Sequence, residues 1–226
     1  MRKTSFANGE YYHIYNRGVD KRDVFCDAED YAKFMVSMKM FNNFSSYEQR
    51  AIIKNNSSNK ELSSRNLELS SLLESKLVEI VCYCLNPNHY HLILKQTGDD
   101  GIRMFMHKIG TSFTNYFNQR NDRSGSLFQG PFKAILIDTN EYLLWLSAYI
   151  NGNAGIHRLS DARNYKWCSY PDYLGSRAGV LCSREAIMSN FADEKEYENY
   201  VDMVISESGS RKDLERYYIE SAQQGA

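Results

Sequence analysis

The sequence predicts an α+β protein built on an antiparallel sheet, and three observations support this fold class. Runs of apolar, aromatic and β-branched residues at 11–16, 78–85 and 89–95 are typical of strands. The turn sequence Asn86-Pro87-Asn88 joins the last two runs and predicts a β-hairpin. Segments with helical spacing of apolar residues lie between the other strands, so that strands and helices alternate.

The first helix is expected directly after Asp27, a good N-cap residue, because Tyr31, Phe34 and Met38 then fall on one helical face. Residues 42–66 differ in composition, since 12 of these 25 are Ser or Asn. They predict a flexible surface insertion. A short second helix is expected over residues 67–77.

The second half of the chain predicts helices with a bent extended segment between them. Asp99-Asp100 is expected to cap a helix that runs from Ile102 to about Asn118. Residues 127–137 should be extended, with a bend at Gly130-Pro131. Asn140 is expected to cap a helix from Glu141 to about Asn153.

The C-terminal part follows an irregular aromatic segment at residues 160–175. The tail from residue 183 predicts two polar helices and holds ten acidic residues against five basic ones. The expected organisation is therefore a main domain at 1–175, including the insertion, and an acidic helical extension at 176–226.

Length and composition fit a single domain with an appendage: the chain has 226 residues, of which 42% are hydrophobic. No apolar run approaches the roughly 20 residues of a membrane span. Five scattered cysteines do not suggest a disulfide framework. These features predict a cytoplasmic protein.

The net charge of −1 conceals an uneven distribution. Residues 1–22 hold five Lys or Arg against two acidic residues, and residues 103–133 hold five against Asp122 alone. Phosphate contacts need local positive charge, not a basic total. The segment 103–133 also interleaves aromatic residues, namely Phe113, Tyr116, Phe117 and Phe128. It therefore predicts a surface for nucleic acid, although solvated charged faces would give the same pattern.

His89-Tyr90-His91 is the first candidate for chemistry. Residues i and i+2 of a strand point to the same face, so the two imidazoles would lie side by side and could share a metal ion. Taken alone, two partly buried structural histidines would be the more common explanation.

Tyr149 and Asn153 form the second candidate. Their i, i+4 spacing on a helix presents the tyrosine hydroxyl and the amide to a common point. An amide oxygen is a good ligand for a hard metal ion. The chain has 17 tyrosines, however, and a packing tyrosine is the simple alternative.

Taken together, these motifs resemble the single-tyrosine HUH transposases of the insertion-sequence type, especially the REP-associated tyrosine transposase branch. Four blocks in the family's order carry the resemblance: Tyr12-His13-Ile14-Tyr15-Asn16-Arg17-Gly18, Leu85 through Leu92, Ser126 through Lys133, and Tyr149 through Asn153 with the following 167–175. The combination is far more specific than any single motif.

The resemblance implies a ferredoxin-like fold with the histidine pair on a central strand. It also implies that Tyr149 is the nucleophile and that His89, His91 and Asn153 hold a divalent metal, Mg²⁺ or Mn²⁺. The expected activity is cleavage and rejoining of single-stranded, hairpin-forming DNA through a covalent 5′-phosphotyrosine. Some relatives are dimers that share tyrosine helices, so a homodimer is one expectation. The residues expected to contact DNA are Arg103, Lys108, Tyr116, Arg120, Arg123 and Lys133.

The chain departs from the family's pattern in two places near the motifs. Tyr90 stands where an aliphatic residue is usual, although its ring can still pack between layers. Ala154 replaces the proline that commonly follows the asparagine. Residues 42–66 and the tail beyond 176 lie outside the best-matched region. This and the replacement at Ala154 bear on DNA binding more than on the chemistry.

Several other residues compete for these roles. Tyr142 lies two turns before Tyr149 and is the best rival nucleophile. His13 is expected to be structural, although it could approach the site, whereas His107 and His157 carry no signal. Cys82 and Cys84 share a strand face, and we expect them to be small buried apolar residues.

Three other functions fit parts of the sequence. A zinc hydrolase would use the two histidines with Cys82 and Cys84 and would form no covalent DNA adduct. A domesticated transposase would bind DNA without catalysis, but the joint presence of both histidines, Tyr149 and Asn153 argues against this. A relaxase shares the histidine pair but usually places its tyrosine before the histidines, the opposite of the order here.

Overall fold

The computed structural model describes residues 5–43 and 76–210. The expected insertion at 42–66 and the short helix at 67–77 lie almost wholly outside the described residues, as does the end of the tail. The elements in chain order are β1 Tyr11–Arg17, η1 Val19–Lys21, α1 Ala28–Met40, β2 Val78–Asn86, β3 His89–Gln96, α4 Gly101–Arg120, β4 Lys133–Ile137, α5 Asn140–Asn151, α6 Asn153–Ile156, η2 Ala162–Asn164, α7 Tyr170–Tyr173, α8 Glu185–Met188 and α9 Glu194–Ser210.

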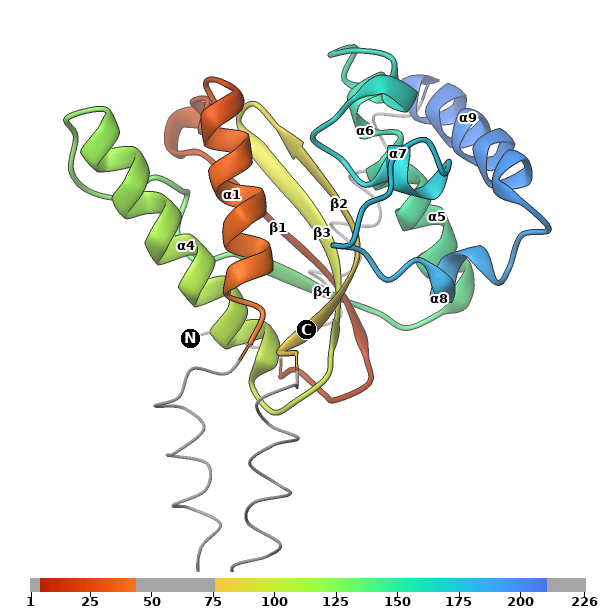
Figure 1. Cartoon of the computed structure of the whole chain (residues 1–226), viewed down its shortest axis with the longest axis horizontal. Helices are drawn as coiled ribbons and strands as arrows, with labels where there is room; N and C mark the ends of the chain where they lie inside the picture. Colours follow the sequence, from red (N-terminus) through yellow and green to blue (C-terminus); the bar gives the residue numbers. More distant parts are fainter. Residues whose placement is uncertain (1–4, 44–75, 211–226) are drawn as a thin grey trace, which may run out of the picture.

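The sheet has four strands in the order β2-β3-β1-β4, and each neighbouring pair is antiparallel. Helix α1 follows β1 and helix α4 follows β3, and both cover one face of the sheet (Figure 1). This is the ferredoxin-like arrangement, with the histidine strand β3 between β1 and β2. The predicted fold class and the hairpin of β2 and β3 are confirmed.

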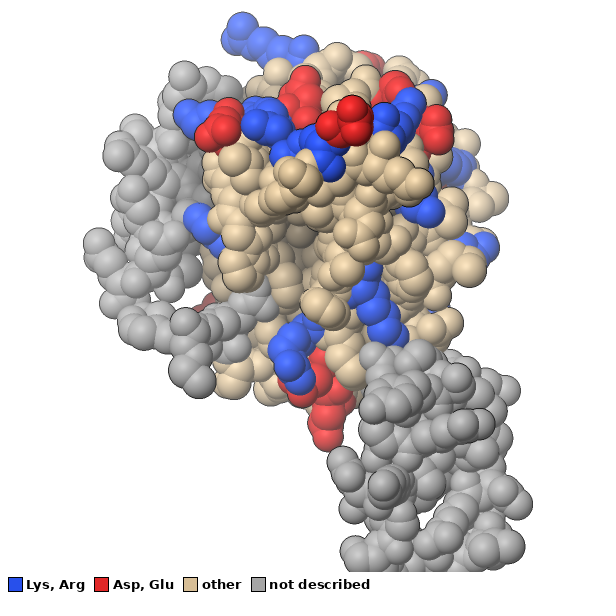
Figure 2. All heavy atoms as spheres, turned by 90° about the vertical axis from the view of Figure 1, so that its left-hand side faces the viewer, with Lys and Arg blue, Asp and Glu red and all other residues tan. Residues whose placement is uncertain are grey.

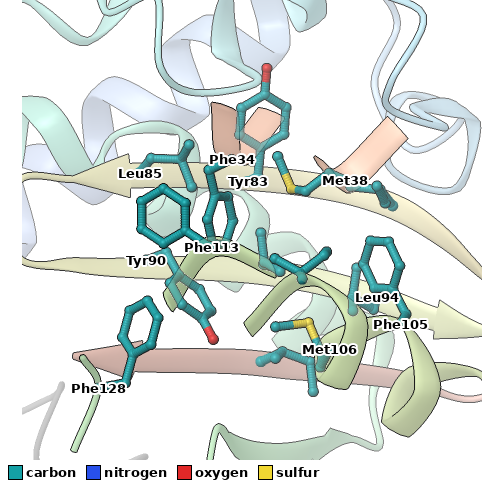
Figure 3. Close-up of a cluster of buried hydrophobic side chains, with 14 of the residues drawn as sticks. Phe34, Met38, Tyr83, Leu85, Tyr90, Leu94, Phe105, Met106, Phe113 and Phe128 are labelled. Atoms are coloured by element: carbon teal, nitrogen blue, oxygen red, sulfur yellow. The ribbon is translucent and has the colours of Figure 1, made fainter. Parts of the chain in front are cut away.

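The face of the sheet under α1 and α4 holds the larger hydrophobic cluster. Phe34 from α1, and Phe105 and Phe113 from α4, are fully buried against strand side chains (Figure 3). Asp27 caps α1 as predicted, since its side chain accepts hydrogen bonds from the backbone N–H groups of Glu29 and Asp30.

The opposite face of the sheet is covered by α5 through α9, which lie together on the other side of the molecule (Figure 1). Tyr197, Val201 and Val204 of α9 are fully buried in this second cluster. The Tyr197 hydroxyl accepts a hydrogen bond from Asn151 of α5. The acidic extension therefore contributes part of the core that supports α5.

Three local predictions about helix ends were wrong. Thr139, not Asn140, is the N-cap of α5, because its hydroxyl accepts from the Tyr142 N–H. Asp100 precedes α4 but has a left-handed backbone, φ 57°, and its side chain makes no capping bond. The helix predicted to reach Asn153 divides at Gly152 into α5 and α6.

Candidate active site

His89 and His91 lie on the face of β3 that α5 covers, as the i, i+2 spacing predicts. Their ring centres are 5.1 Å apart and the ring planes are nearly perpendicular, at 89°. The intervening Tyr90 is buried in the cluster on the opposite face. Strand alternation thus places both imidazoles on one side of the sheet.

His91 is held by a third histidine from the neighbouring strand. Nε2 of His13 lies 2.9 Å from Nδ1 of His91, and the two rings are stacked. Both side chains are buried, and burial lowers the pKa of His13 to about 3 and that of His91 well below its usual value. Two neutral imidazoles can share this hydrogen bond only if one of these nitrogens carries the proton. When Nδ1 of His91 donates, its Nε2 keeps a lone pair for a ligand.

His89 is oriented by the turn that precedes it. The side-chain oxygen of Asn88 lies 2.6 Å from Nδ1 of His89, and Asn88 can only accept at this oxygen, so Nδ1 donates. Nε2 therefore carries the lone pair, and it lies 3.0 Å from the amide nitrogen of Asn86. Burial, together with the positive charges of His157 and Arg17, lowers the pKa of His89 to about 3.

The lowered pKa values of these histidines predict an acid-sensitive fold. In the unfolded chain each imidazole gains a proton near pH 6.5, whereas in the folded chain His13 and His89 stay neutral to about pH 3. Stability is thus full above pH 6.5 and falls as the pH drops toward 3. The upper limit is about 1.4 kcal/mol per pH unit for each histidine.

Urea unfolding at pH 7 and pH 5.5, with a chelator present, measures this effect. We expect a lower free energy of unfolding at pH 5.5. Equal values at the two pH values would contradict the neutral, buried histidines.

Asn153 brings an amide oxygen to the same place. Its Oδ1 accepts a hydrogen bond of 2.6 Å from the amide nitrogen of Asn86, the same nitrogen that lies beside Nε2 of His89. The Asn153 amide nitrogen is buried without a hydrogen-bond partner. An unsatisfied buried donor costs about 1–3 kcal/mol, so the oxygen is held toward the site at a cost. Lone pairs of two predicted metal ligands therefore converge on one point.

Tyr149 lies on α5, one turn before Asn153, and its ring faces His91. The ring centres are 6.1 Å apart and nearly perpendicular. On its other side the Tyr149 ring stacks on Trp145, at 5.4 Å and 14°. Ala148 and Ile150 are fully buried and fix the helix against the sheet. Tyr142 stacks on Trp145 at 6.4 Å, further along the helix.

A pocket of about 310 Å³ opens beside the two histidines; we call it the catalytic pocket. Two exposed cations, Arg17 at the end of β1 and Lys133 at the start of β4, line it together with His157. The antiparallel register explains Arg17, because this residue pairs with His89 across β1 and β3. Three imidazoles, the side chain of Tyr15 and two cations thus line one small cavity.

Comparisons with known proteins find one similar sequence family and a similar fold. The family model described as "Transposase IS200 like" matches residues 44–153, which include both histidines, Tyr149 and Asn153. Over these residues, just under half of the chain, the sequence is similar to the IS200-like transposases. A solved structure described as "the REP associates tyrosine transposase bound to a REP hairpin" has the same fold, with a TM-score of 0.53 and 13% identity over 82% of this chain and 95% of that one. A search of curated proteins found no match.

Sequence reasoning missed or set aside two residues of the catalytic pocket, His157 and Arg17. The His157 ring centre lies 5.3 Å from that of His89, although His157 carries no motif. A signal existed: Tyr149, Asn153 and His157 repeat at i, i+4 and i+8. Arg17 had no local signal, because only the pairing of β1 with β3 brings it to His89.

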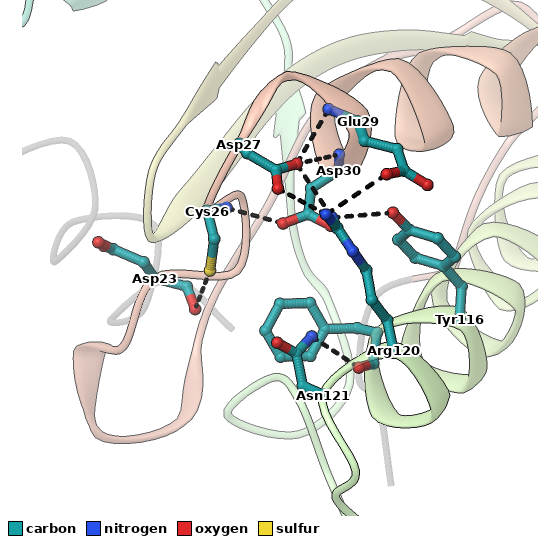
Figure 4. Close-up of polar contacts among 9 residues, drawn as sticks. Asp23, Cys26, Asp27, Glu29, Asp30, Tyr116, Arg120 and Asn121 are labelled. Carbon is teal, nitrogen blue, oxygen red and sulfur yellow. Dashed lines mark hydrogen bonds and ion pairs between the residues drawn. The ribbon is translucent and has the colours of Figure 1, made fainter.

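Arg120, predicted to contact DNA, is bound by carboxylates of the same chain. Its guanidinium pairs with Asp27 at 2.6 Å, Asp30 at 2.7 Å and Glu29 at 3.3 Å (Figure 4). The Tyr116 hydroxyl accepts a further bond from Arg120. The Asp30 side chain is 1% exposed. The arginine therefore neutralises a buried acid and joins α4 to α1.

The other basic residues predicted for DNA are divided between different places. Arg103 forms an exposed ion pair with Asp100, and Lys108 donates to the Asn43 carbonyl. Arg123 donates to the side chain of Asn118 and the carbonyl of Ser126. Lys133 alone of the predicted set lines the catalytic pocket.

The aromatic residues interleaved in the same segment were also misjudged. Phe113 and Phe117 belong to the core, at 0% and 5% exposure, so they cannot stack on bases. The periodicity that suggested stacking is that of the buried face of α4.

Cys82 and Cys84 are fully buried, and burial raises the pKa of both thiols. A zinc ion needs thiolates, which this environment opposes. Within residues 5–43 and 76–210, no group of three or more His, Cys, Asp or Glu side chains could hold a metal ion. In the same part of the chain, no helix is long and apolar enough to span a membrane.

Proposed function

We propose that this transposase cleaves and rejoins single-stranded DNA through a covalent bond between Tyr149 and a 5′-phosphate. The observation that carries the proposal is the convergence of Nε2 of His89 and Oδ1 of Asn153 on one point. The ring of Tyr149 faces the adjacent His91. The solved structure with the same fold, described as bound to a REP hairpin, supports hairpin-forming DNA as the substrate.

The donor set fits a divalent cation such as Mn²⁺ or Mg²⁺. His89 and His91 are neutral because burial opposes their protonation, and neutral imidazole and amide oxygen are both metal ligands. Asn86 donates to the two lone pairs that the cation would take, so its amide has to turn when the ion binds. When bound, the ion would polarise a non-bridging phosphate oxygen and offset the charge that develops there.

The proposed reaction has two phosphoryl-transfer steps, and Tyr149 takes part in both. The Tyr149 oxygen forms a bond to phosphorus, and the bond from phosphorus to the 3′-oxygen breaks, which leaves a free 3′-OH after that oxygen takes a proton. In the second step another 3′-OH attacks the phosphotyrosine and the tyrosine regains its proton. Arg17 and Lys133 are placed to hold the phosphate, since both line the pocket.

A covalent intermediate would favour strand transfer over simple hydrolysis, because it keeps the phosphodiester energy and rejoining then needs no nucleotide cofactor. One chain supplies both histidines, Asn153 and Tyr149.

The proposal is tested by incubating the protein with single-stranded hairpin DNA and Mn²⁺ and separating the products on a denaturing gel. We expect a protein–DNA adduct and a released strand with a 3′-OH. DNA cleaved with no adduct would indicate a hydrolase, and binding without cleavage would indicate a DNA-binding protein.

From their positions in the structure, we expect Arg17 and Lys133, but not Arg120, to contribute to DNA binding. We expect the double variant Arg17→Ala with Lys133→Ala to flatten the dependence of log affinity on log salt concentration by roughly 0.7 per lost phosphate contact. Arg120→Ala should leave this slope unchanged, because Arg120 is already paired within the protein. It should instead lower the midpoint of thermal unfolding, since Asp30 would be left buried without its counter-ion.

Salt titrations of single-stranded DNA binding, by fluorescence anisotropy, measure the slopes. Arg120→Ala is the matched control, as it removes one charge of the same kind from the same protein. A flattened slope for Arg120→Ala and none for the double variant would reverse the assignment.

A further inference from the structure

A second cavity, of about 600 Å³, lies on the opposite side of the sheet from the two histidines; we call it the α4 pocket. Its walls are α4 and the segment 126–132. It meets the catalytic pocket at the end of β1, because Asn16 lines both cavities. The segment 126–132 passes between the two cavities. Its residue Gln129 lines the catalytic pocket, and the following residue, Gly130, lines the α4 pocket.

The segment between the two pockets is fixed to β1 by hydrogen bonds. Asn16 donates from its amide to the Gly130 carbonyl at 3.0 Å, and the Gln129 N–H donates to the Arg17 carbonyl at 2.9 Å. Gly130 has φ +101°, which disfavours any residue with a side chain. The two cavities are thus neighbours held in a fixed relation.

The same strand contributes to both pockets. His89 and His91 face the catalytic pocket, and Tyr90, between them, faces the α4 pocket. The Tyr90 ring packs edge to face on Phe128, at 5.6 Å, and its hydroxyl points toward the space between Phe128 and Met106 (Figure 3). An aliphatic residue at this position would fill the core equally well but would bring no hydroxyl.

The lining of the α4 pocket differs chemically from that of the catalytic pocket. Phe128 and Phe132 contribute aromatic surface, and Thr111, Thr114 and Asn115 contribute neutral polar groups from α4. Among the described lining residues, Arg103 is the one Lys or Arg, and it is paired with Asp100. Figure 2 shows a hollow in this side of the molecule surrounded mainly by uncharged atoms. An apolar ring with polar edges fits such a surface, whereas a phosphate does not.

Gly110 provides an independent observation. It lies in the middle of the 20-residue helix α4 and lines the pocket. Glycine is, after proline, the least favourable residue inside a helix. A Cβ added to Gly110 would meet no atom within 4 Å, so packing within the protein does not require glycine here. A side chain would enter the pocket, and its absence keeps that space open.

We propose that the α4 pocket receives one unpaired nucleobase of the single-stranded DNA, close to the phosphate that Tyr149 attacks. The proposal rests on the proposed function, because the base is expected to belong to the strand that is cleaved. The base lies against Phe132, which is partly exposed, and its polar edge meets the hydroxyl and amide groups of the rim. The pocket thereby selects the sequence at the cleavage site.

Gly110→Leu tests the proposal, because it fills the pocket from a position where nothing clashes. Leucine is also a better helix former than glycine, so the midpoint of thermal unfolding should not fall. We expect the affinity for a single-stranded oligonucleotide containing the cleavage site to fall roughly tenfold or more, the effect of losing one stacked base. Gly110→Ala adds one methyl group and should give a smaller loss than Gly110→Leu. The matched control is Gln119→Leu, which adds leucine to an exposed position of α4 outside the pocket and should bind as the parent protein does.

An abasic scan identifies the base. Oligonucleotides that lack one base at successive positions near the cleavage site are titrated against the parent and against Gly110→Leu. We expect one position where the missing base weakens binding to the parent but has no further effect on the variant, since both changes remove the same contact. If Gly110→Leu binds as tightly as the parent, or if losses add at every position, the pocket does not hold a base.

These outcomes are independent of the adduct assay. A parent protein that forms no adduct but shows the abasic coupling would overturn the proposed function and support the pocket. A parent that forms the adduct while Gly110→Leu binds and cleaves normally would overturn the pocket alone.

Discussion

Tyr149→Phe should abolish the covalent protein–DNA adduct while single-stranded DNA and metal still bind as they do to the parent. The change removes the oxygen that is proposed to bond to phosphorus and keeps the ring, which packs between His91 and Trp145. Loss of a hydrogen bond from that oxygen would cost about 1 kcal/mol of stability. The fold should therefore persist, with an adduct yield below detection.

The measurement is a denaturing gel with 5′-labelled and 3′-labelled hairpin substrates, alongside an anisotropy assay of binding. Tyr142→Phe is the matched control, because Tyr142 lies on the same helix and stacks on the same Trp145. It should keep full adduct formation. If the cleaved 5′ end still cross-links to Tyr149→Phe, the nucleophile is another residue, and the Tyr142 variant then becomes the deciding experiment.

The sequence predicted those parts of the site that depend on local geometry. The alternation of a strand determines that His89 and His91 share a face, and no distant residue can alter it. The i, i+4 relation of Tyr149 and Asn153 survived even though the helix divides at Gly152, because the backbone there stays near helical values, φ −80° and ψ −5°.

Features that depend on tertiary pairing were not predictable from spacing. His13 was expected to be structural, yet it contacts His91 because β1 lies beside β3 in a register that pairs Tyr15 with His91. Arg17 reaches the pocket through the same register. The positions of His13 and Arg17 both follow from the order of the strands, which the sequence pattern alone does not give.

The count of basic residues in segment 103–133 did not identify which of them are available to bind DNA, because tertiary packing decides this. Arg120 counts toward a basic segment in sequence, but α4 packs on α1 and brings it to the carboxylates of Asp27 and Asp30. Helical periodicity likewise directs Phe113 inward. The α4 pocket therefore depends on the absence of a side chain at Gly110 at least as much as on the charged residues of α4.

The largest effect expected outside the nucleophile belongs to His89. His89→Ala removes a proposed metal ligand, and the loss of metal stabilisation of the transition state, several kcal/mol, corresponds to a cleavage rate lower by roughly 1000-fold. DNA affinity should change little, because the proposed phosphate contacts come from Arg17 and Lys133. Asn88→Ala offers a graded comparison: Asn88 accepts the hydrogen bond from Nδ1 of His89 and so orients the ring. Loss of such a supporting contact typically costs about 10- to 100-fold in metal affinity or activity.

The predicted order is therefore parent, Asn88→Ala and His89→Ala, both in Mn²⁺ affinity measured by calorimetry and in single-turnover cleavage. Calorimetry measures Mn²⁺ binding in the absence of DNA, so a loss of DNA binding cannot account for a change in Mn²⁺ affinity. If both variants bind Mn²⁺ as the parent does, the histidine pair is not a metal site. If His89→Ala instead loses DNA binding and cleavage to the same extent, the histidine contacts the DNA directly and the division between metal ligands and phosphate contacts is wrong.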